Sequence, residues 1–175
     1  MIKTIKEIIK FQNKYITLFN NEVESHNGQK FFHIRIEEGE NGKNNGVIII
    51  TKYKDKYLML NSYRYGIDEN IWEFPRGYKN KGESSEFSAQ RELKEETNLD
   101  DIKSIQEIGK VSTNPSIINN EINIVLIELN SIDNLILQDE EFIKNKKFVK
   151  IIDIETKDAM TLSALSILWF HENKI

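Results

Sequence analysis

The 175-residue sequence contains no cysteine. Disulfide bonds, thiolate nucleophiles and cysteine-based zinc sites are therefore excluded. Histidine is scarce as well, and the three histidines, His26, His33 and His171, do not have the spacing of a metal site. Each of them alone is typical of a surface or packing residue.

A long hydrophobic run is also missing from the start of the chain. MIKTIKEIIKFQNK carries a charged side chain every few positions, which matches neither a signal peptide nor a membrane span. A cytoplasmic location is therefore the default expectation. The net charge of −4 gives no general attraction to nucleic acid or to an anionic membrane. We expect neither as a partner, and a polyanionic substrate would need local arginine, lysine or bound metal.

The composition is typical of a folded protein. Apolar residues make up 39% of the chain, charged residues 30% and aromatic residues 10%, unlike the composition of disordered segments. The length suits one domain with a substantial core and an N-terminal appendage. We place the appendage at residues 1–45 and the main domain at residues 46–175.

The hydrophobic patterns predict an α+β fold with mixed strands. Residues 3–10 form a weak amphipathic segment, and Ala159, Leu162, Leu165 and Trp169 recur at helical spacing, which predicts a closing helix from about Asp158. Polar loops are expected at residues 37–46, 113–120 and 131–142. Residues 47–65 contain two strand-like runs with Asp55 and Lys56 between them, which predicts a central hairpin. The other strand-like runs are residues 14–20, 30–37, 71–75, 101–112, 121–129 and 148–154.

Three glutamates lie close together in the stretch Gly77–Leu99. At about 100° per residue in a helix, Glu92, Glu95 and Glu96 fall within a single arc of roughly 100°. Their like charges repel by a few tenths of a kcal/mol per pair, and a bound divalent cation would reverse the sign of this effect. Because Mg²⁺ prefers hard oxygen ligands, the pattern predicts a magnesium site. A solvated acidic helix face is the alternative interpretation.

The same stretch contains residues that can start, stop and anchor this helix. Ser84 can cap the first free backbone N–H groups. Asn98 lies just past the last turn, where a left-handed residue commonly ends a helix. Ala89 and Leu93 lie on the neighbouring arc and can pack against a core. The helix is therefore expected from Ser84 to Asn98, with one edge buried and an acidic flank.

The spacing of these residues resembles the Nudix box of the Nudix hydrolases. Gly77 is followed after five residues by Glu83, and after seven more by RELKEETNL at residues 91–99. The one departure is Asn98, where the family usually has glycine. Asparagine is the usual second choice in a left-handed position, so the departure is compatible with the helix end.

The resemblance implies an α/β/α sandwich with a mixed sheet, and hydrolysis of a nucleoside diphosphate linked to another group. It also implies a metal, Mg²⁺ with Mn²⁺ as the alternative. The roles that it implies are metal ligation by Glu92 and Glu96, ligation or water orientation by Glu95, support by the pair Arg91 and Glu83, and ligation by the backbone carbonyl of Arg76.

Similarity beyond the box is to the ADP-ribose pyrophosphatase branch, and it covers most of residues 14–170. Members of that branch usually form homodimers through their N-terminal strands, so the resemblance implies a homodimer. The segments that carry the similarity are Tyr63-Arg64, WEFPRG at 72–77, the loop with Pro115 that ends at Glu121, DEEF at 139–142 and KDAMTLSAL at 157–165.

The branch also implies residues for substrate and catalysis. Arg64 matches an arginine that contacts the substrate, although a surface arginine at a strand end is the alternative. Glu141 is the better candidate for a catalytic base and Glu140 the second, with a solvated acidic loop as the other interpretation. Glu121 matches a further active-site carboxylate. Arg76 stands where the branch usually has alanine, and places a cation beside the phosphate site.

Four aromatic side chains admit two interpretations. Trp72, Phe74, Tyr63 and Tyr65 could offer a face for adenine, or they could be core residues of strands. Departures near the substrate region, such as Ser62 in place of glutamine, affect the choice of substrate more than the reaction.

The predicted function is Mg²⁺-dependent hydrolysis of a nucleoside diphosphate sugar, with ADP-ribose giving AMP and ribose 5-phosphate as the first choice. Another nucleotide sugar or a dinucleotide is the alternative within the family. The alternative functions from other classes are a non-catalytic nucleotide sensor and a structural interaction protein. All three box glutamates are present, which favours catalysis.

Overall fold

The structure, a computed structural model, describes residues 1–39, 46–136 and 142–173. The chain divides into two compact units. Unit 1 contains Met1–Asn45 and Ser112–Glu121, and unit 2 contains Gly46–Val111 and Ile122–Ile175. Among the described residues, no helix has the length and apolar character needed to cross a membrane.

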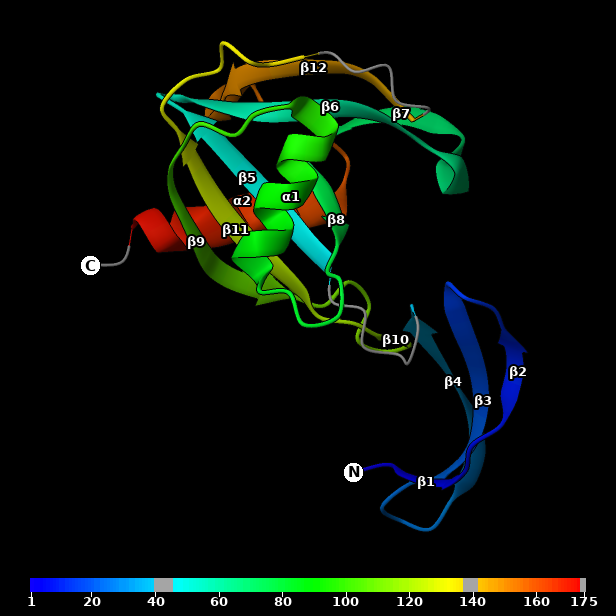
Figure 1. The fold of residues 1–175 in the computed structure, drawn as a ribbon. Coiled ribbons are helices and arrows are strands. Elements are labelled where there is room, and N and C mark those ends of the chain that lie inside the picture. Colours follow the sequence, from blue (N-terminus) through cyan, green and yellow to red (C-terminus); the bar gives the residue numbers. More distant parts are fainter. Residues whose placement is uncertain (40–45, 137–141, 174–175) are drawn as a thin grey trace. The chain divides into compact units, whose positions relative to one another are not determined.

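Unit 2 is built on a mixed sheet whose described strands run in the order β12-β6-β5-β11-β9 (Figure 1). β7 pairs with β6 and β8 pairs with β5 at its margins. The central pair, β5 and β11, is parallel, and the other pairings are antiparallel. The strands are β5 (Gly46–Tyr53), β6 (Lys56–Arg64), β7 (Glu69–Glu73), β8 (Arg76–Tyr78), β9 (Ile102–Val111), β11 (Ile122–Leu129) and β12 (Ile143–Lys150).

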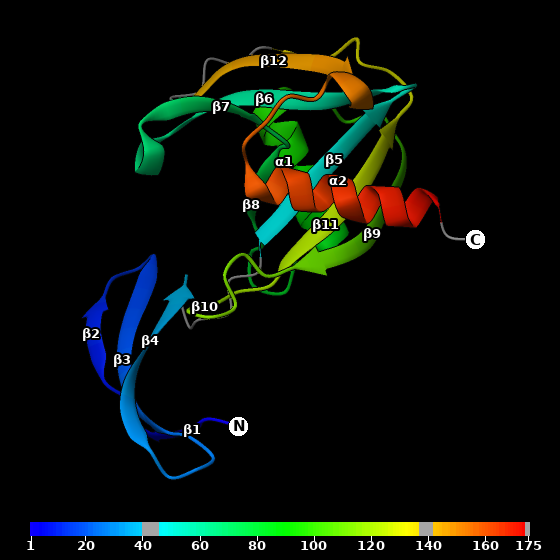
Figure 2. The ribbon, with the colours of Figure 1, turned by 180° about the vertical axis from the view of Figure 1, so that it is seen from behind.

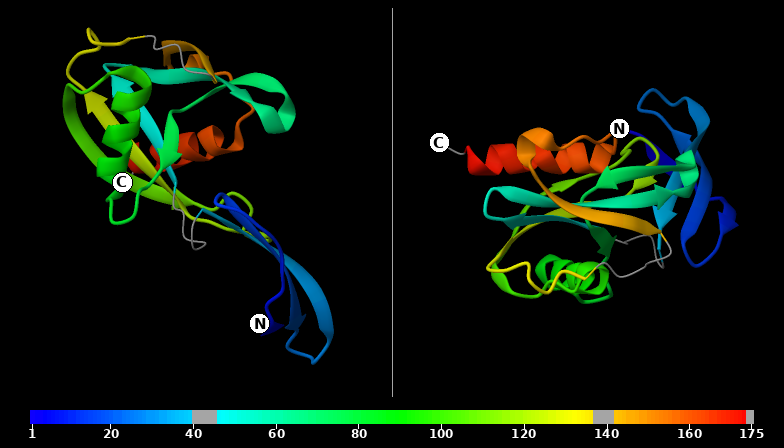
Figure 3. Two further views of the ribbon diagram at one scale, coloured as in Figure 1. Left: turned by 45° about the vertical axis from the view of Figure 1, so that its right-hand side comes forward. Right: turned by 90° about the horizontal axis from the view of Figure 1, so that it is seen from above.

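Two helices cover opposite faces of this part of the sheet, as Figures 1 and 2 show from front and back and Figure 3 shows from above. Successive side chains of β5 point to opposite faces. Ile49 therefore packs in one core with Leu93, and Ile48 in the other with Leu168. The expected α/β/α sandwich with a mixed sheet is confirmed. The helices are α1 (Ser85–Thr97) and α2 (Ala159–Glu172).

The predicted ends of α1 are confirmed. The Ser84 side chain accepts a hydrogen bond from the Phe87 backbone N–H at 3.1 Å. Asn98 has φ of +62°, and its backbone N–H donates to the Lys94 carbonyl at 2.8 Å. The left-handed residue ends the helix immediately before Leu99, which is buried against the same core.

Substitutions at Asn98 should separate the backbone effect from the side-chain effect. Asn98→Ala is expected to lower the free energy of unfolding by about 1 kcal/mol, since a Cβ without local hydrogen bonding is disfavoured at positive φ. Asn98→Gly should retain stability. Both variants lose the Asn98 hydrogen bond to the Asn134 carbonyl, so the difference between them in urea denaturation isolates the backbone. Equal stability of the two would contradict this account.

Unit 1 is a smaller sheet in which the described strands run β1-β3-β4-β10, with β2 also on β3. β3 and β4 contain most of the strand-like runs expected at residues 14–20 and 30–37, and they form a long antiparallel hairpin. Its buried positions alternate along β3, from Thr17 to Val23, as expected for a strand with one covered face. The strands are β1 (Lys3–Lys6), β2 (Ile9–Gln12), β3 (Ile16–Glu24), β4 (Lys30–Glu38) and β10 (Ile118–Asn119).

Several predicted boundaries are wrong, and most of the errors involve pairing with a distant segment. Residues 3–10 belong to β1 and β2 instead of one amphipathic segment, because both strands pair with β3. β8 follows the predicted strand 71–75 and was not expected, and β10 lies in the predicted loop 113–120. The last strand begins at Ile143, and Ile151–Asp153 form a 3₁₀ turn. Tyr65–Ile67 form another 3₁₀ turn between β6 and β7.

Candidate active site

Glu92 projects from α1 against the backbone of β8. A Cβ on Gly77 would lie 2.0 Å from the Glu92 Cδ, so glycine is the residue that leaves room for this carboxylate. Ala89 and Leu93 on the same helix are fully buried and fix its inner edge. The packing of the helix thus places Glu92 beside the Gly77 backbone.

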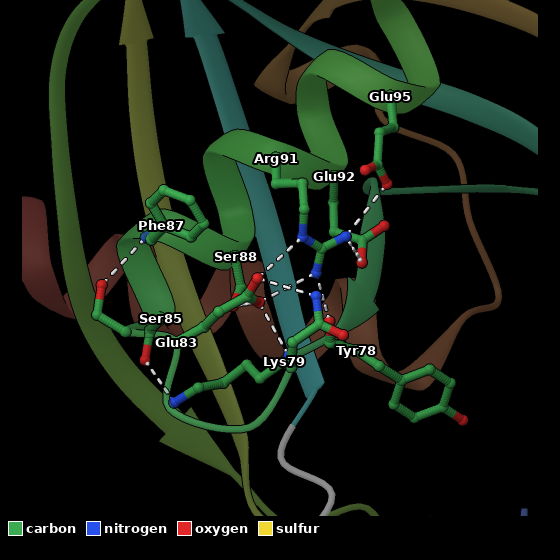
Figure 4. Close-up of polar contacts among 11 residues, drawn as sticks. Tyr78, Lys79, Glu83, Ser85, Phe87, Ser88, Arg91, Glu92 and Glu95 are labelled. Atoms are coloured by element: carbon green, nitrogen blue, oxygen red, sulfur yellow. Dashed lines mark hydrogen bonds and ion pairs between the residues drawn. The ribbon is translucent and has the colours of Figure 1, made fainter.

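Arg91 is the centre of the polar contacts on this flank (Figure 4). Its guanidinium binds the carboxylates of Glu83 at 3.2 Å, Glu92 at 2.8 Å and Glu95 at 3.1 Å. It also donates to the Tyr78 carbonyl at 2.8 Å. The predicted pair of Arg91 and Glu83 is confirmed, and this single cation also joins two of the three predicted glutamates and the end of β8.

The Glu83 carboxylate accepts hydrogen bonds from several donors of the loop and helix. Besides Arg91, it binds the Ser88 hydroxyl at 2.7 Å, and the Asn80 backbone and side chain at 2.9 Å each. Arg91, followed by Ser88 and Asn80, holds the pKa of Glu83 well below its usual range. Glu83 therefore stays ionised and secures the loop to α1.

Burial has the opposite effect on Glu92. It raises the pKa of the Glu92 carboxyl above the ordinary value, while Arg91 opposes the rise. Hydrogen bonding to Glu83 raises the pKa of Arg91, which keeps the guanidinium charged. The flank therefore combines a support carboxylate of lowered pKa with a carboxyl whose ionisation is opposed by burial and favoured by Arg91.

Glu96 is half-buried one turn after Glu92, and Glu95 is exposed. The Glu96 carbonyl accepts a hydrogen bond from the buried Lys146 of β12, a contact that the sequence did not predict. Within the described ranges, no three histidine, cysteine, aspartate or glutamate side chains converge closely enough to hold a metal ion. Arg91 is the cation shared by Glu92 and Glu95 in this structure.

The close contact at Gly77 gives a prediction about Glu92. Gly77→Ala should displace the Glu92 carboxylate and destabilise the protein by about 1–3 kcal/mol, as overpacking does. Gly66→Ala is the matched control, since a Cβ on Gly66 meets nothing within 4 Å. Thermal denaturation of both variants tests the prediction, and equal melting temperatures would contradict it.

Arg64 and Arg76 lie together around one buried carboxylate that sequence reasoning missed. Glu73, at the end of β7, accepts from Arg64 Nε at 3.0 Å and from Arg76 Nη2 at 2.6 Å. Arg76 also lies 3.6 Å from Asp158. The glutamate inside the apolar run IWEFP could have indicated this buried ion pair, because a charged residue is rarely buried unless it is paired.

The remaining predicted residues are spread over different parts of the chain. Glu121 belongs to unit 1. Glu140 and Glu141, the candidates for a catalytic base, lie outside the described residues.

The four aromatic candidates differ in exposure. Phe74 is buried and Tyr65 is 87% exposed. Trp72 has the Lys147 ammonium 4.0 Å from its ring centroid, and the Tyr63 hydroxyl donates to Asp68. The core interpretation therefore holds for Phe74 but not for Tyr65.

Comparisons with known proteins agree on one family. The sequence model described as "NUDIX domain" matches residues 42–170. ADP-ribose pyrophosphatase of Bacillus subtilis (strain 168) is 28% identical over 162 residues, which cover 91% of this chain and 82% of that protein. A methanol dehydrogenase activator of Bacillus methanolicus is also 28% identical over 162 residues, covering 90% of this chain and 80% of that protein.

A solved structure described as an ADP compounds hydrolase has the same fold. Its TM-score is 0.78 at 21% sequence identity, and the match covers 99% of this chain and 97% of that one.

Proposed function

The chain belongs to the NUDIX family, and from this premise we propose that it is an enzyme similar to ADP-ribose pyrophosphatases, which hydrolyses the pyrophosphate bond of a nucleoside diphosphate sugar. The family resemblance read from Gly77–Leu99 is confirmed by the family match over residues 42–170. ADP-ribose is the substrate to test first. Water would attack one phosphorus of the P–O–P linkage, and the bond from that phosphorus to the bridging oxygen would break. One phosphate gains the hydroxyl and the other keeps the bridging oxygen, so the products are AMP and ribose 5-phosphate.

The observation that carries the proposal is the arrangement around Arg91. One guanidinium holds Glu83, Glu92 and Glu95 at the end of β8. A solvated acidic helix face would not require such a shared cation or the bare backbone at Gly77. These contacts therefore favour a prearranged carboxylate site over a solvated acidic helix face.

The donor chemistry of this site fits a divalent ion. Carboxylate and carbonyl oxygens are hard ligands, and Gly77 leaves the space in which the Glu92 carboxylate lies. The residues that would hold Mg²⁺, or alternatively Mn²⁺, are Glu92, Glu95, Glu96 and the carbonyl of Arg76. When bound, the ion would neutralise phosphate charge and lower the pKa of a water molecule.

The protein's own groups would bind and orient the substrate and move the proton. Arg64 would contact a phosphate with the outer edge of its guanidinium, and Glu121 would bind the substrate. Glu95 would orient the attacking water, while Glu141, or Glu140 as the second candidate, would accept its proton. Glu83 would anchor Arg91, and Arg91 would in turn keep Glu92 and Glu95 in place.

We also propose that residues 46–175 carry the reaction and that residues 1–45 form the interface of a homodimer. Unit 1 exposes apolar side chains on its strands, including Phe11, Phe32 and Ile34, each about half exposed or more. Such side chains are typical of surfaces covered by another chain. Light scattering after gel filtration should therefore give twice the monomer mass, and a monomer would reject the proposal.

The proposed reaction is tested by measuring phosphate-containing products from a panel of nucleotide sugars and one dinucleotide, with Mg²⁺ and with a chelator. We expect cleavage of ADP-ribose with metal and none with the chelator. The panel is broad because two relatives of equal identity have different names. Binding of a compound that is unaffected by the chelator, without any cleavage, would reject the enzyme and favour the sensor alternative.

A further inference from the structure

Glu73 is a buried carboxylate shared by two arginines of unit 2. Only 2% of its side chain is exposed. Arg64 donates to it through both Nε and Nη2, and Arg76 donates through Nη2 at 2.6 Å. A carboxylate is costly to bury unless it is paired, so the two guanidiniums account for its place in the fold.

The charges around Glu73 are balanced. Asp158, at the start of α2, lies 3.6 Å from the second terminal nitrogen of Arg76. Arg76 thus lies between two carboxylates, and only 18% of its side chain is exposed. Burial and the charge of Arg64 lower the pKa of Arg76, while Glu73 opposes this. The guanidinium of Arg76 is therefore occupied by its contacts with Glu73 and Asp158.

Arg64 occupies a different position in the same cluster. Its side chain is 38% exposed. The edge formed by Nε and Nη2 faces Glu73, and the planar guanidinium leaves Nη1 on the opposite edge. A bidentate pair fixes the plane of a guanidinium as well as its position. Arg64 is thus held by one edge of its guanidinium against Glu73, while its side chain remains partly exposed.

We propose that Glu73 is a positioning residue, which holds Arg64 so that its outer edge meets a phosphate of the substrate. Arg76 donates to the same Glu73 oxygen as Arg64 Nε, so Glu73 is the shared acceptor of both guanidiniums. Binding orders flexible side chains at a cost, and a guanidinium that is already oriented avoids part of it. The proposal rests on the proposed function, because it assumes that Arg64 contacts the substrate.

A double-mutant cycle with Glu73→Gln and Arg64→Gln tests this assignment. Glu73→Gln should raise KM for ADP-ribose by up to about 10-fold and leave kcat nearly unchanged, since orientation of a binding group is lost. In the Arg64→Gln background the same substitution should have no further effect on KM. Additive effects in the cycle, or an unchanged KM, would overturn the proposal.

Glu69→Gln is the matched control for loss of a nearby negative charge. Glu69 is the cross-strand neighbour of Arg64 in the pairing of β6 with β7, but it binds Lys157. The Glu69→Gln variant should therefore leave the KM for ADP-ribose unchanged. If Glu73→Gln does not fold, Glu73→Asp keeps the charge and withdraws the oxygens by one methylene, so it should raise KM in the same direction.

A measurement without substrate separates this proposal from the proposed function. The Arg64 Nε–H group should be rigid by ¹⁵N relaxation in the unaltered protein and mobile in Glu73→Gln. Unchanged rigidity would overturn the positioning role. Absence of turnover by the unaltered protein would instead reject the proposed function.

Discussion

Replacing Glu96 by glutamine should reduce turnover of ADP-ribose at least about 100-fold while the protein remains folded. Loss of a residue that only supports a metal ligand typically costs 10–100-fold, and a ligand itself should cost no less. The amide has nearly the volume of the carboxylate but lacks its charge. Glu96 is half-buried, and the helix on which it lies is fixed by Ala89 and Leu93.

Steady-state kinetics and a thermal melting curve check this prediction together. Glu86→Gln is the matched control, because Glu86 lies in the first turn of the same helix and is not one of the described carboxylates that pair with Arg91. It should keep full activity. Full activity of Glu96→Gln would refute its assignment as a metal ligand.

The second large effect is expected at Arg91, even for a substitution that keeps the charge. Arg91→Lys should lower kcat/KM by about 10–100-fold. An ammonium is a single point charge without the planar fork, so it cannot hold Glu83, Glu92 and Glu95 together as the guanidinium does. Arg91→Ala should lose more activity, because three carboxylates then repel without a shared cation.

Lys94→Gln is the control for Arg91. Lys94 lies on the same helix and forms an exposed ion pair with Asp100, and such pairs contribute little. Kinetics of the three variants with saturating metal should therefore rank Lys94→Gln near the unaltered protein, Arg91→Lys below it and Arg91→Ala lowest. Full activity of Arg91→Lys would show that charge alone suffices at this position.

Local features of the fold could be predicted from the sequence because their causes are local. Ser84 and Asn98 mark the ends of α1 through contacts within four residues. Asp158 similarly begins α2 by accepting a hydrogen bond from the Thr161 backbone N–H. The pair of Arg91 and Glu83 also lies within one loop and helix. In each case the partners are close in the chain.

Features that depend on distant partners could not be predicted in this way. β10 has only two residues, and it is a strand because it pairs with β4. β8 is three residues long and pairs with β5. Glu73 was read as part of a buried strand, but its two arginine partners and Asp158 come from three other elements. Arg64 and Arg76 are only nine and three residues from Glu73 in the chain, but their pairing depends on how β6, β7 and β8 come together, and Asp158 lies far along the sequence.

The parallel pairing at the centre of unit 2 has a consequence for how the protein folds. Val47 of β5 pairs with Asn123 of β11, so all of α1 and β9 intervene between the two strands. Contacts of such large sequence separation are formed at a high cost in loop-closure entropy and slow the folding reaction. During synthesis, β5 can pair with β6 and β8 early. Its other edge stays open until residue 129 has left the ribosome.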